Sequence, residues 1–122
     1  MLLNIPVQSH VLRIVAFIRP HKLEEVKTAL SAKGVTGLTV TECRGCGSSP
    51  ETTEWFQGES YVISLPPRIK LETVVTEDMK EVAIEAILKS ARTGRTGDGK
   101  IFVLPELDAV RIRTGERGDI AL

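Results

Sequence analysis

The feature that most constrains the fold is the order in which two kinds of hydrophobic spacing follow each other along the chain. Apolar residues recur at helical spacing twice, from Pro20 to about Lys33 and again over 77–92. Six other stretches alternate in polarity or are rich in β-branched residues, as strands are. They are VLRIVAFIRP (11–20), VTGLTVTEC (35–43), ESYVISL (59–65), RIKLETVV (68–75), KIFVLP (100–105) and AVRIRTG (109–115).

This order predicts an α+β domain with the ferredoxin-like βαββαβ arrangement, in which two helices cover one face of an antiparallel sheet. The 122 residues suit one domain. The polar stretch 44–58 contains Gly and Pro50, which predicts a long loop between the second and third strands, and such loops are usually functional. The sheet face opposite the helices also carries apolar residues, so we expect copies of the chain to associate through it.

Charge and hydropathy exclude several classes of protein. The chain has 16 Lys and Arg and 16 Asp and Glu, so no net field attracts nucleic acid, and an anion site needs local clustering of charge. No apolar run approaches the roughly 20 residues that cross a bilayer. Residues 1–11 lack the basic start and long apolar core of a secretory signal. We therefore expect a cytoplasmic protein that does not bind nucleic acid.

The stretch TGRTGDGKIF (93–102) nearly matches a phosphate-binding P-loop. Gly94, Gly99 and Lys100 fit the motif, but Ile101 stands where Ser or Thr would hold Mg²⁺. The stretch also follows a predicted helix and precedes a predicted strand, whereas a P-loop joins a strand to a helix whose N-terminus faces the phosphate. This position argues against a Walker-type NTPase.

The composition of this region still suits phosphate. Glycines let the backbone turn sharply and expose N–H groups, and Arg side chains bind phosphate oxygens in pairs. Arg111 and Arg113 alternate along a predicted strand, so both should point to the same face. Seven cations (89, 92, 95, 100, 111, 113, 117) face four acids (98, 106, 108, 116), a local excess of three. The alternative is a helix end followed by a solvated, charged hairpin.

No constellation indicates catalysis. The chain has no G-x-S-x-G or H-E-x-x-H motif, and His10 and His21 are isolated, so we expect no enzymatic activity. Cys43 and Cys46 form a C-x-x-C pair, but the second pair or His that completes a zinc site is missing, so we expect no metal site. We interpret them as two unpaired thiols at a strand end, with a redox switch or opportunistic metal binding as the alternative.

Four blocks of the sequence together resemble the PII nitrogen-regulatory signalling proteins. They are IRPHKLEEVKTAL, GVTGLTVTECRGCG, ARTGRTGDGKIFV and VRIRTGERGDIAL, and the third and fourth are highly specific. The resemblance covers residues 12–122 and leaves 1–11 as an N-terminal extension. It implies a homotrimer of ferredoxin-like subunits that regulates other proteins and carries no covalent cofactor. It also implies that ATP and ADP compete for the clefts between neighbouring subunits.

The resemblance assigns residues to that nucleotide site. The stretch 93–100 is similar to the B-loop that cradles phosphates, and arginines of the adjoining subunit, just before a C-terminal loop at 114–122, reach the phosphates. The residues carried over are Thr39, Gly45, Cys46, Gly47, Gly97, Asp98, Gly99, Lys100, Arg111 and Arg113. By the same resemblance Thr39 lies near the adenine, and Gly45, Cys46 and Gly47 line the cleft at the base of the long loop.

Residues 47–68 are similar to the T-loop, which changes shape with the ligand and binds partner proteins. Many members sense 2-oxoglutarate through a Gln that chelates Mg²⁺ beside ATP, and Ser49 occupies that position here. Arg68 replaces a Lys that pairs with the 2-oxoglutarate carboxylate. Tyr61 stands where some members are uridylylated, in a loop that otherwise departs widely from theirs.

This changed ligand set predicts a changed input signal. One hypothesis is energy charge alone, read as ATP, ADP or AMP. Another is a small anion such as bicarbonate, held by Arg68 or Arg44 beside the nucleotide. That hypothesis follows PII-like proteins associated with inorganic-carbon uptake and carboxysomes, and it makes a membrane transporter the regulated partner. The alternative is a nitrogen-regulatory PII protein that senses 2-oxoglutarate together with ATP and Mg²⁺.

Overall fold

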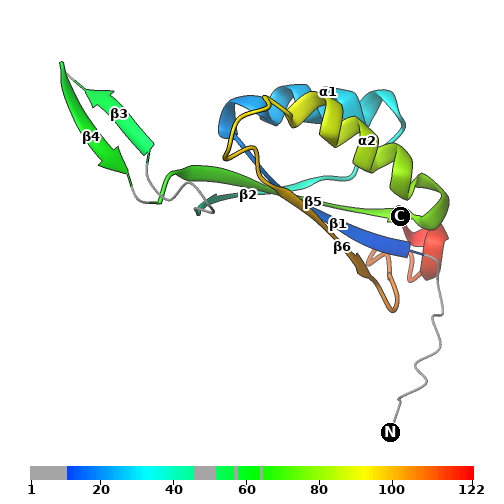
Figure 1. Ribbon diagram of the computed structural model, residues 1–122. Helices are drawn as coiled ribbons and strands as arrows, with labels where there is room; N and C mark the ends of the chain where they lie inside the picture. Colours follow the sequence, from blue (N-terminus) through cyan, green and yellow to red (C-terminus); the bar gives the residue numbers. More distant parts are fainter. Residues whose placement is uncertain (1–10, 46–51, 57, 64) are drawn as a thin grey trace, which may run out of the picture.

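The computed structural model describes residues 11–45, 52–56, 58–63 and 65–122, with the backbone alone for 52–56 and 60–63. A four-stranded antiparallel sheet, in the order β2-β5-β1-β6, carries two helices on one face (Figure 1). Its strands are β1 (Val11–Ile18), β2 (Thr39–Arg44), β5 (Pro67–Thr76) and β6 (Lys100–Pro105). The helices are α1 (Leu23–Ala32) and α2 (Lys80–Ala91), each preceded by a 3-10 turn, Pro20–Lys22 and Glu77–Met79. The predicted ferredoxin-like arrangement is confirmed.

The core lies between the helices and the sheet, and β1 is its central strand. β1 pairs antiparallel with β5 on one side and with β6 on the other. Side chains alternate across a strand, and Ile14, Ala16 and Ile18 of β1 are buried under the helices. The most deeply buried core residues are Ile14, Ala16, Ile18, Val26, Leu30, Leu71, Ala83 and Ile87. Neither helix in the described part of the chain has the length and apolar character that crossing a membrane requires.

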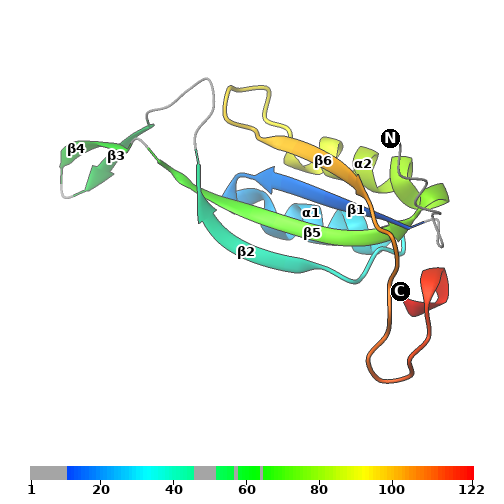
Figure 2. The ribbon, with the colours of Figure 1, turned by 90° about the horizontal axis from the view of Figure 1, so that it is seen from below.

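The opposite face of the sheet has no covering layer among the described residues (Figure 2). Phe102 and Leu104 lie on this face, where they pair in register with Val15 and Arg13. The ring of Phe102 meets that of Phe17 edge to face, with centroids 6.2 Å apart, yet Phe102 remains 49% exposed and Leu104 45%. Large apolar side chains exposed together mark a surface that contacts another molecule.

The stretch predicted to be a long loop contains a strand. β3 (Thr52–Phe56) pairs with β4 (Glu59–Ile63) in a separate antiparallel hairpin, which projects from one end of the sheet (Figure 1). The predicted strand 59–65 therefore pairs with β3 and not with the main sheet. Gly58 has φ +81° in the short connection, a conformation that glycine adopts readily. β3 pairs with its neighbour β4 and not with the main sheet, and its residues lie in a stretch whose polar composition resembles that of a loop. The prediction therefore missed it.

The second strand begins later than predicted, at Thr39 and not at Val35. The cause is a side chain: the hydroxyl of buried Thr73 donates a hydrogen bond to the Gly37 carbonyl oxygen at 2.7 Å. This bond satisfies a backbone acceptor before the β2–β5 ladder starts at the pair Thr39 and Glu72.

Replacing Thr73 by Val should lower the free energy of unfolding by about 1–2 kcal/mol, because the isosteric side chain leaves the Gly37 carbonyl without its donor. Thr41→Val makes the same change at an exposed position of β2 and should alter stability by less than about 0.5 kcal/mol. Urea denaturation at one fixed protein concentration measures both. Equal midpoints for the two variants would show that the hydrogen bond contributes nothing.

Candidate functional site

The glycine-rich loop between α2 and β6 is folded around one carboxylate. The carboxylate of Asp98 accepts hydrogen bonds from the backbone N–H groups of Thr93 and Gly94, each at 2.9 Å, and from the Thr93 hydroxyl. These N–H groups lie just beyond the last turn of α2. The Asp98 side chain therefore points back into its own loop. There it accepts hydrogen bonds from backbone N–H groups that follow the end of α2.

Arg19, the residue after β1, ties this loop to the sheet. Its Nε donates to Asp98 at 3.1 Å, and its Nη2 donates to the Thr96 carbonyl oxygen at 2.8 Å. The hydrogen bonds from Thr93 and from Arg19 hold the pKa of Asp98 well below its usual range, although partial burial acts in the opposite direction. The sequence alone did not point to Arg19, because its partner Asp98 is 79 positions away. The one feature of the sequence that could have indicated it is a cation at the end of a predicted strand.

Two glycines let this loop approach its neighbours closely. Gly97 and Gly99 have φ of +101° and +103°, which side chains other than glycine rarely adopt. A Cβ at Gly99 would lie 1.7 Å from the Phe17 carbonyl oxygen. A Cβ at Gly97 would lie 3.2 Å from Nη2 of both Arg19 and Arg68. The loop is thus pressed against the end of β1 and lies beside the start of β5.

Arg68 also belongs to the root of the projecting hairpin, which therefore lies beside the glycine-rich loop. At this root the Nη1 of Arg44 donates to the Leu65 carbonyl oxygen at 3.1 Å. The Gly45 N–H donates to the Pro66 carbonyl oxygen, also at 3.1 Å. The structure therefore brings Arg44, Gly45 and Arg68 together at the hairpin root, and it places the Arg68 guanidinium next to Gly97.

The charge around this loop favours an anion. Lys100 follows Gly99, is exposed, and begins β6 opposite Phe17. Arg19, Arg68 and the loop's own Arg95 join it, so four cations lie in or beside the stretch 93–100, whose one acid is Asp98. Cations combined with turning glycine backbone form the kind of concavity that binds phosphate or carboxylate.

Two further predicted nucleotide-binding residues, Arg111 and Arg113, lie beyond the other end of β6. The segment that carries Arg111 and Arg113 follows the far end of β6 (Figure 2). Thr39 and Leu122 line one depression there, and Arg111 donates to the Leu122 carbonyl oxygen at 2.8 Å. β6 alone separates its first and last residues by roughly 17 Å at about 3.4 Å per residue. Lys100 and these arginines therefore lie beyond opposite ends of β6 in one chain.

Residues 109–115 do not form the strand that the sequence predicts. In this part of the chain Val110 and Arg117 make an isolated bridge, and residues 112–114 form a turn. Arg111 and Arg113 therefore do not share the face of a strand. The prediction relied on alternation alone, whereas the Arg111–Glu116 ion pair at 3.1 Å folds this segment back on itself.

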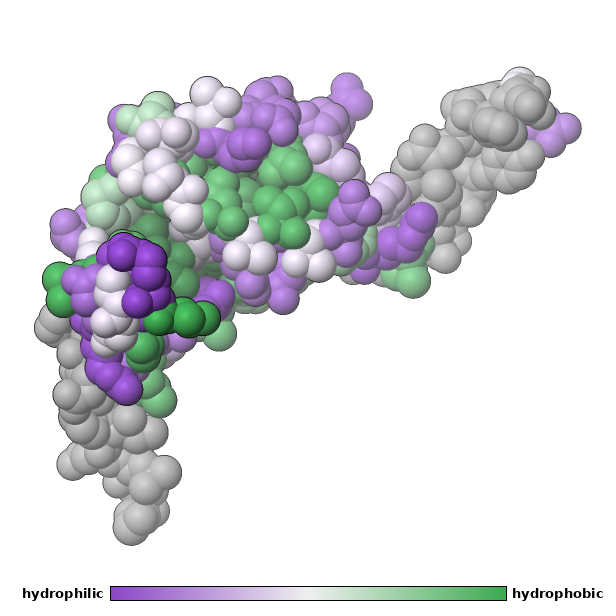
Figure 3. All heavy atoms as spheres, turned by 180° about the vertical axis from the view of Figure 1, so that it is seen from behind, coloured by the Kyte–Doolittle hydropathy of each residue, from purple (hydrophilic) through white to green (hydrophobic). Residues whose placement is uncertain are grey.

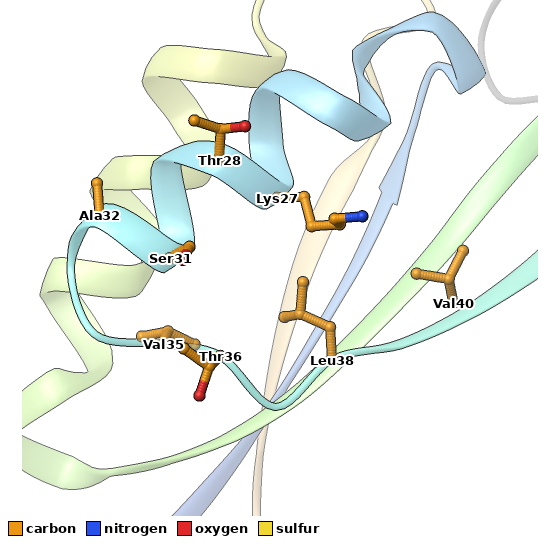
Figure 4. Close-up of a pocket in the computed structure, with 8 residues that line it drawn as sticks. All are labelled: Lys27, Thr28, Ser31, Ala32, Val35, Thr36, Leu38 and Val40. Atoms are coloured by element: carbon orange, nitrogen blue, oxygen red, sulfur yellow. The ribbon is translucent and has the colours of Figure 1, made fainter.

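A larger groove lies elsewhere, between α1 and the edge strand β2 (Figure 4). Leu38 and Val40 project from the β2 side toward Lys27 of α1. Seen from behind, apolar side chains gather between the helical layer and the edge of the sheet (Figure 3). None of the predicted site residues that the structure describes lines this groove.

Several predicted residues are placed only in part. Cys43 is a free thiol whose Sγ lies 3.5 Å from the Arg68 carbonyl oxygen. Tyr61 lies in β4, opposite Glu54 of β3. Cys46, Gly47 and Ser49 lie outside the described residues. Within the described ranges, no group of three His, Cys, Asp or Glu side chains is placed to hold a metal ion.

Comparison with known proteins identifies the family. The family model "Nitrogen regulatory protein P-II" matches residues 11–116. The chain belongs to the P-II family. A Cereibacter sphaeroides nitrogen regulatory protein P-II is 50% identical over 110 residues, 90% of this chain and 98% of the relative. A Methanothermobacter thermautotrophicus nitrogen regulatory protein P-II 2 is 52% identical over 109 residues, 89% of this chain and 95% of the relative.

A solved structure of the same family has the same fold. The crystal structure of Arabidopsis thaliana PII bound to citrate superposes with a TM-score of 0.77 at 38% sequence identity, covering 93% of this chain and 94% of that one. The resemblance seen in the four sequence blocks is thereby confirmed. This P-II chain is a member of a family of regulatory proteins.

Replacing Gly99 by Ala in this P-II protein should lower the free energy of unfolding by about 3–5 kcal/mol. The alanine would have to adopt a positive φ, and its Cβ would collide with the Phe17 carbonyl oxygen. Gly94→Ala is the matched control in the same loop. Gly94 has φ +87° but nothing within 4 Å of a Cβ, so the cost should be about 1–2 kcal/mol. Guanidinium denaturation of both variants measures the difference, and equal losses would contradict the close approach.

The low pKa of Asp98 also predicts a pH dependence. A carboxyl whose pKa is lower in the folded than in the unfolded state stabilises the fold above its unfolded value of about 3.9, and that stabilisation is lost as the pH falls further. The Tm difference between wild type and Asp98→Asn should therefore be largest near neutral pH and shrink below about pH 4. Asp119→Asn, at an exposed position, is the control. A Tm difference that does not change with pH would contradict this account.

Proposed function

We propose that this P-II protein is a regulator that binds an adenine nucleotide, ATP or ADP, between neighbouring copies of the chain. The observation that carries the proposal is the separation of two cationic groups on one sheet. The glycine-rich loop with Lys100 lies at one end of β6, and the segment with Arg113 follows the other end. A second copy is the simplest way to bring both groups to one ligand.

The loop with Lys100 suits the phosphates of that nucleotide. Asp98 holds the backbone of the loop, which we propose as the B-loop at 93–100, in a fixed shape before the ligand arrives. The backbone at Gly97 and Gly99 presents no side chain to obstruct an approaching oxygen, and Lys100 supplies a compact charge. A loop that is already ordered loses less entropy on binding.

The sheet supports a closed assembly of copies. Phe102 and Leu104 remain exposed on the uncovered face. Both edge strands of the four-stranded sheet, β2 and β6, pair on one side only in the described chain. Contacts between unlike edges generate rings when the rotation closes, and we propose the homotrimer implied by the family resemblance. In this arrangement 12–122 is the domain, 1–11 an extension, and 114–122 the C-terminal loop near the neighbour's nucleotide.

The projecting hairpin is the proposed output. It lies within the segment 47–68, which we propose as the T-loop, and its root residue Arg68 lies beside Gly97 of the B-loop. A ligand that changes the position of this root changes the direction in which the hairpin projects toward a partner protein. A coupling free energy of about 1–3 kcal/mol is enough for such a switch.

A second candidate input is 2-oxoglutarate, sensed together with ATP and Mg²⁺. What favours it is that the relatives are named nitrogen regulatory proteins and that the Arabidopsis PII structure is described as bound to citrate, a carboxylate. Arg68 lies beside Gly97 and suits such an anion, whereas Arg19 is already paired with Asp98. The names of these relatives do not mention inorganic carbon or transporters. Bicarbonate is therefore left as an alternative input for the titration, and a transporter as an alternative partner.

Calorimetric titration with ADP and with ATP, each repeated with Mg²⁺ plus 2-oxoglutarate and with bicarbonate, tests these proposals. Tighter ATP binding with 2-oxoglutarate supports the nitrogen-sensing input. Coupling to bicarbonate alone supports the inorganic-carbon input. Nucleotide binding without either effect supports energy charge as the input signal. If neither ADP nor ATP binds, the proposed site is wrong.

A site shared between copies predicts complementation. Lys100→Ala and Arg113→Ala should each weaken ADP binding by about tenfold or more, because each removes one charge-assisted contact. Trimers refolded from an equal mixture of the two variants should regain wild-type affinity at about a quarter of their sites, where an intact loop meets an intact arginine. Lys89→Ala, at an exposed position of α2, is the control. No recovery in the mixture would contradict a shared site.

A further inference from the structure

The projecting hairpin of β3 and β4 differs in charge from the rest of the molecule. Among the described strands, β3 and β4 pair only with each other, so each strand has an unpaired outer edge (Figure 1). Between Arg44 and Arg68 the sequence contains three of the chain's 16 Asp and Glu and none of its 16 Lys and Arg. The hairpin therefore belongs to a negatively charged segment in a chain whose formal net charge is zero.

The register of the hairpin places its acids beside aromatic residues. Glu54 lies opposite Tyr61, and Phe56 lies opposite Glu59. Directly paired residues share a face of a sheet, as do residues two apart in one strand, so these four lie together on one face. Each cross-strand pair joins one carboxylate to one aromatic ring. We call Glu54, Phe56, Glu59 and Tyr61 the acid–aromatic quartet.

The other face of the hairpin has no charged residue among those described. Trp55 is paired with Ser60, and Thr53 with Val62. These four positions are shifted by one residue along each strand and therefore lie on the opposite face from the quartet. A charged partner would thus distinguish the two faces.

We propose that the acid–aromatic quartet docks an extended segment of a partner protein through arginine side chains, each of which contacts one carboxylate and one ring. The inference rests on the proposed function, in which this hairpin is the output. A guanidinium pairs with carboxylate oxygens through its fork of N–H groups and stacks on aromatic rings. The ammonium group of lysine is more strongly hydrated and lacks this flat fork, so arginine fits the quartet better.

The unpaired edges of the hairpin determine the shape of the partner segment. An extended segment can add to such an edge as a third strand. Its alternate side chains then lie on the face of the quartet, at the same two-residue repeat that separates the two acid–aromatic pairs. Because a two-stranded hairpin alone is only marginally stable in water, a third strand also stabilises the hairpin. The partner segment that fits best therefore carries arginine at alternate positions.

Three labelled peptides test this docking surface by fluorescence anisotropy with the nucleotide-free protein. Each has about ten residues and repeats Arg-Thr, Lys-Thr or Glu-Thr, since threonine favours an extended backbone. The Arg-Thr peptide should bind about threefold or more tightly than the Lys-Thr peptide. The Glu-Thr peptide should not bind, because its charge has the sign of the hairpin's.

Variants on the two faces test which residues dock the peptide. Tyr61→Leu and Glu54→Gln should each weaken binding of the Arg-Thr peptide about threefold, because each removes one of the two contacts of an arginine. Tyr61→Phe keeps the ring and should stay within about 1.5-fold of wild type. Trp55→Leu alters a ring on the uncharged face and should also stay within about 1.5-fold. Glu24→Gln, which removes the same charge from an exposed position of α1, is the matched control for Glu54→Gln.

Several outcomes would overturn the docking surface. One is equal affinity for the Arg-Thr and Lys-Thr peptides, and another is no binding of either. Equal losses for Trp55→Leu and Tyr61→Leu would show that the quartet is not the face that docks. A loss for Glu24→Gln as large as that for Glu54→Gln would show that net charge alone attracts the peptide.

ADP titration of the same samples separates this inference from the proposed function. Lys100→Ala should weaken ADP binding and leave the peptide affinity of the nucleotide-free protein unchanged. If wild type binds ADP but shows no face-specific preference for the Arg-Thr peptide, the docking surface fails and the proposed nucleotide site stands. If the peptide binds with this preference and neither ADP nor ATP binds, the proposed function fails and the docking surface stands.

Discussion

The hydrogen-bonded ladders on both sides of β1 determine where every other part of this protein lies. β1 pairs with β5 from Val11 to Ile18 and with β6 from Leu12 to Phe17, so both neighbours take their register from one strand. A slip of one residue would turn the buried side chains of β1 out of the core, and this makes the register strongly specified. The same register sets Lys100 opposite Phe17 and therefore delivers the glycine-rich loop to the end of β1.

At that end, three contacts fix the shape of the glycine-rich loop. Gly99 approaches the Phe17 carbonyl more closely than any side chain permits. Asp98 caps the exit from α2, and Arg19 holds Asp98 from the sheet side. The acid in this loop is thus occupied by structural hydrogen bonds. The P-II resemblance alone does not distinguish this role of Asp98 from direct contact with the nucleotide.

The proposed function follows from the distance between two ends of one sheet. A ligand held by Lys100 is out of reach of Arg113 in the same chain, so binding and assembly become one requirement. The uncovered face with Phe102 and the unpaired sheet edges favour such an assembly. The projecting hairpin starts beside the same loop, at Arg68. In the proposed assembly, nucleotide, neighbouring copy and hairpin would meet at one place, as a regulator that reports its ligand to a partner requires.

The sequence by itself determined the helices, the strand 100–105 and the family. Helical spacing and motif blocks are local patterns, and Gly34 and Gly94 lie just beyond the ends of α1 and α2 with positive φ. It did not determine β3, the late start of β2, or the turn at 111–116. Each of these depends on a hydrogen-bonding partner that spacing does not reveal: β4 for β3, Thr73 for Gly37, and Glu116 for Arg111. Only the tertiary structure decided that Arg19 supports Asp98 and that Lys100 and Arg113 lie beyond opposite ends of β6, because contacts between residues far apart in the chain arise when the sheet assembles.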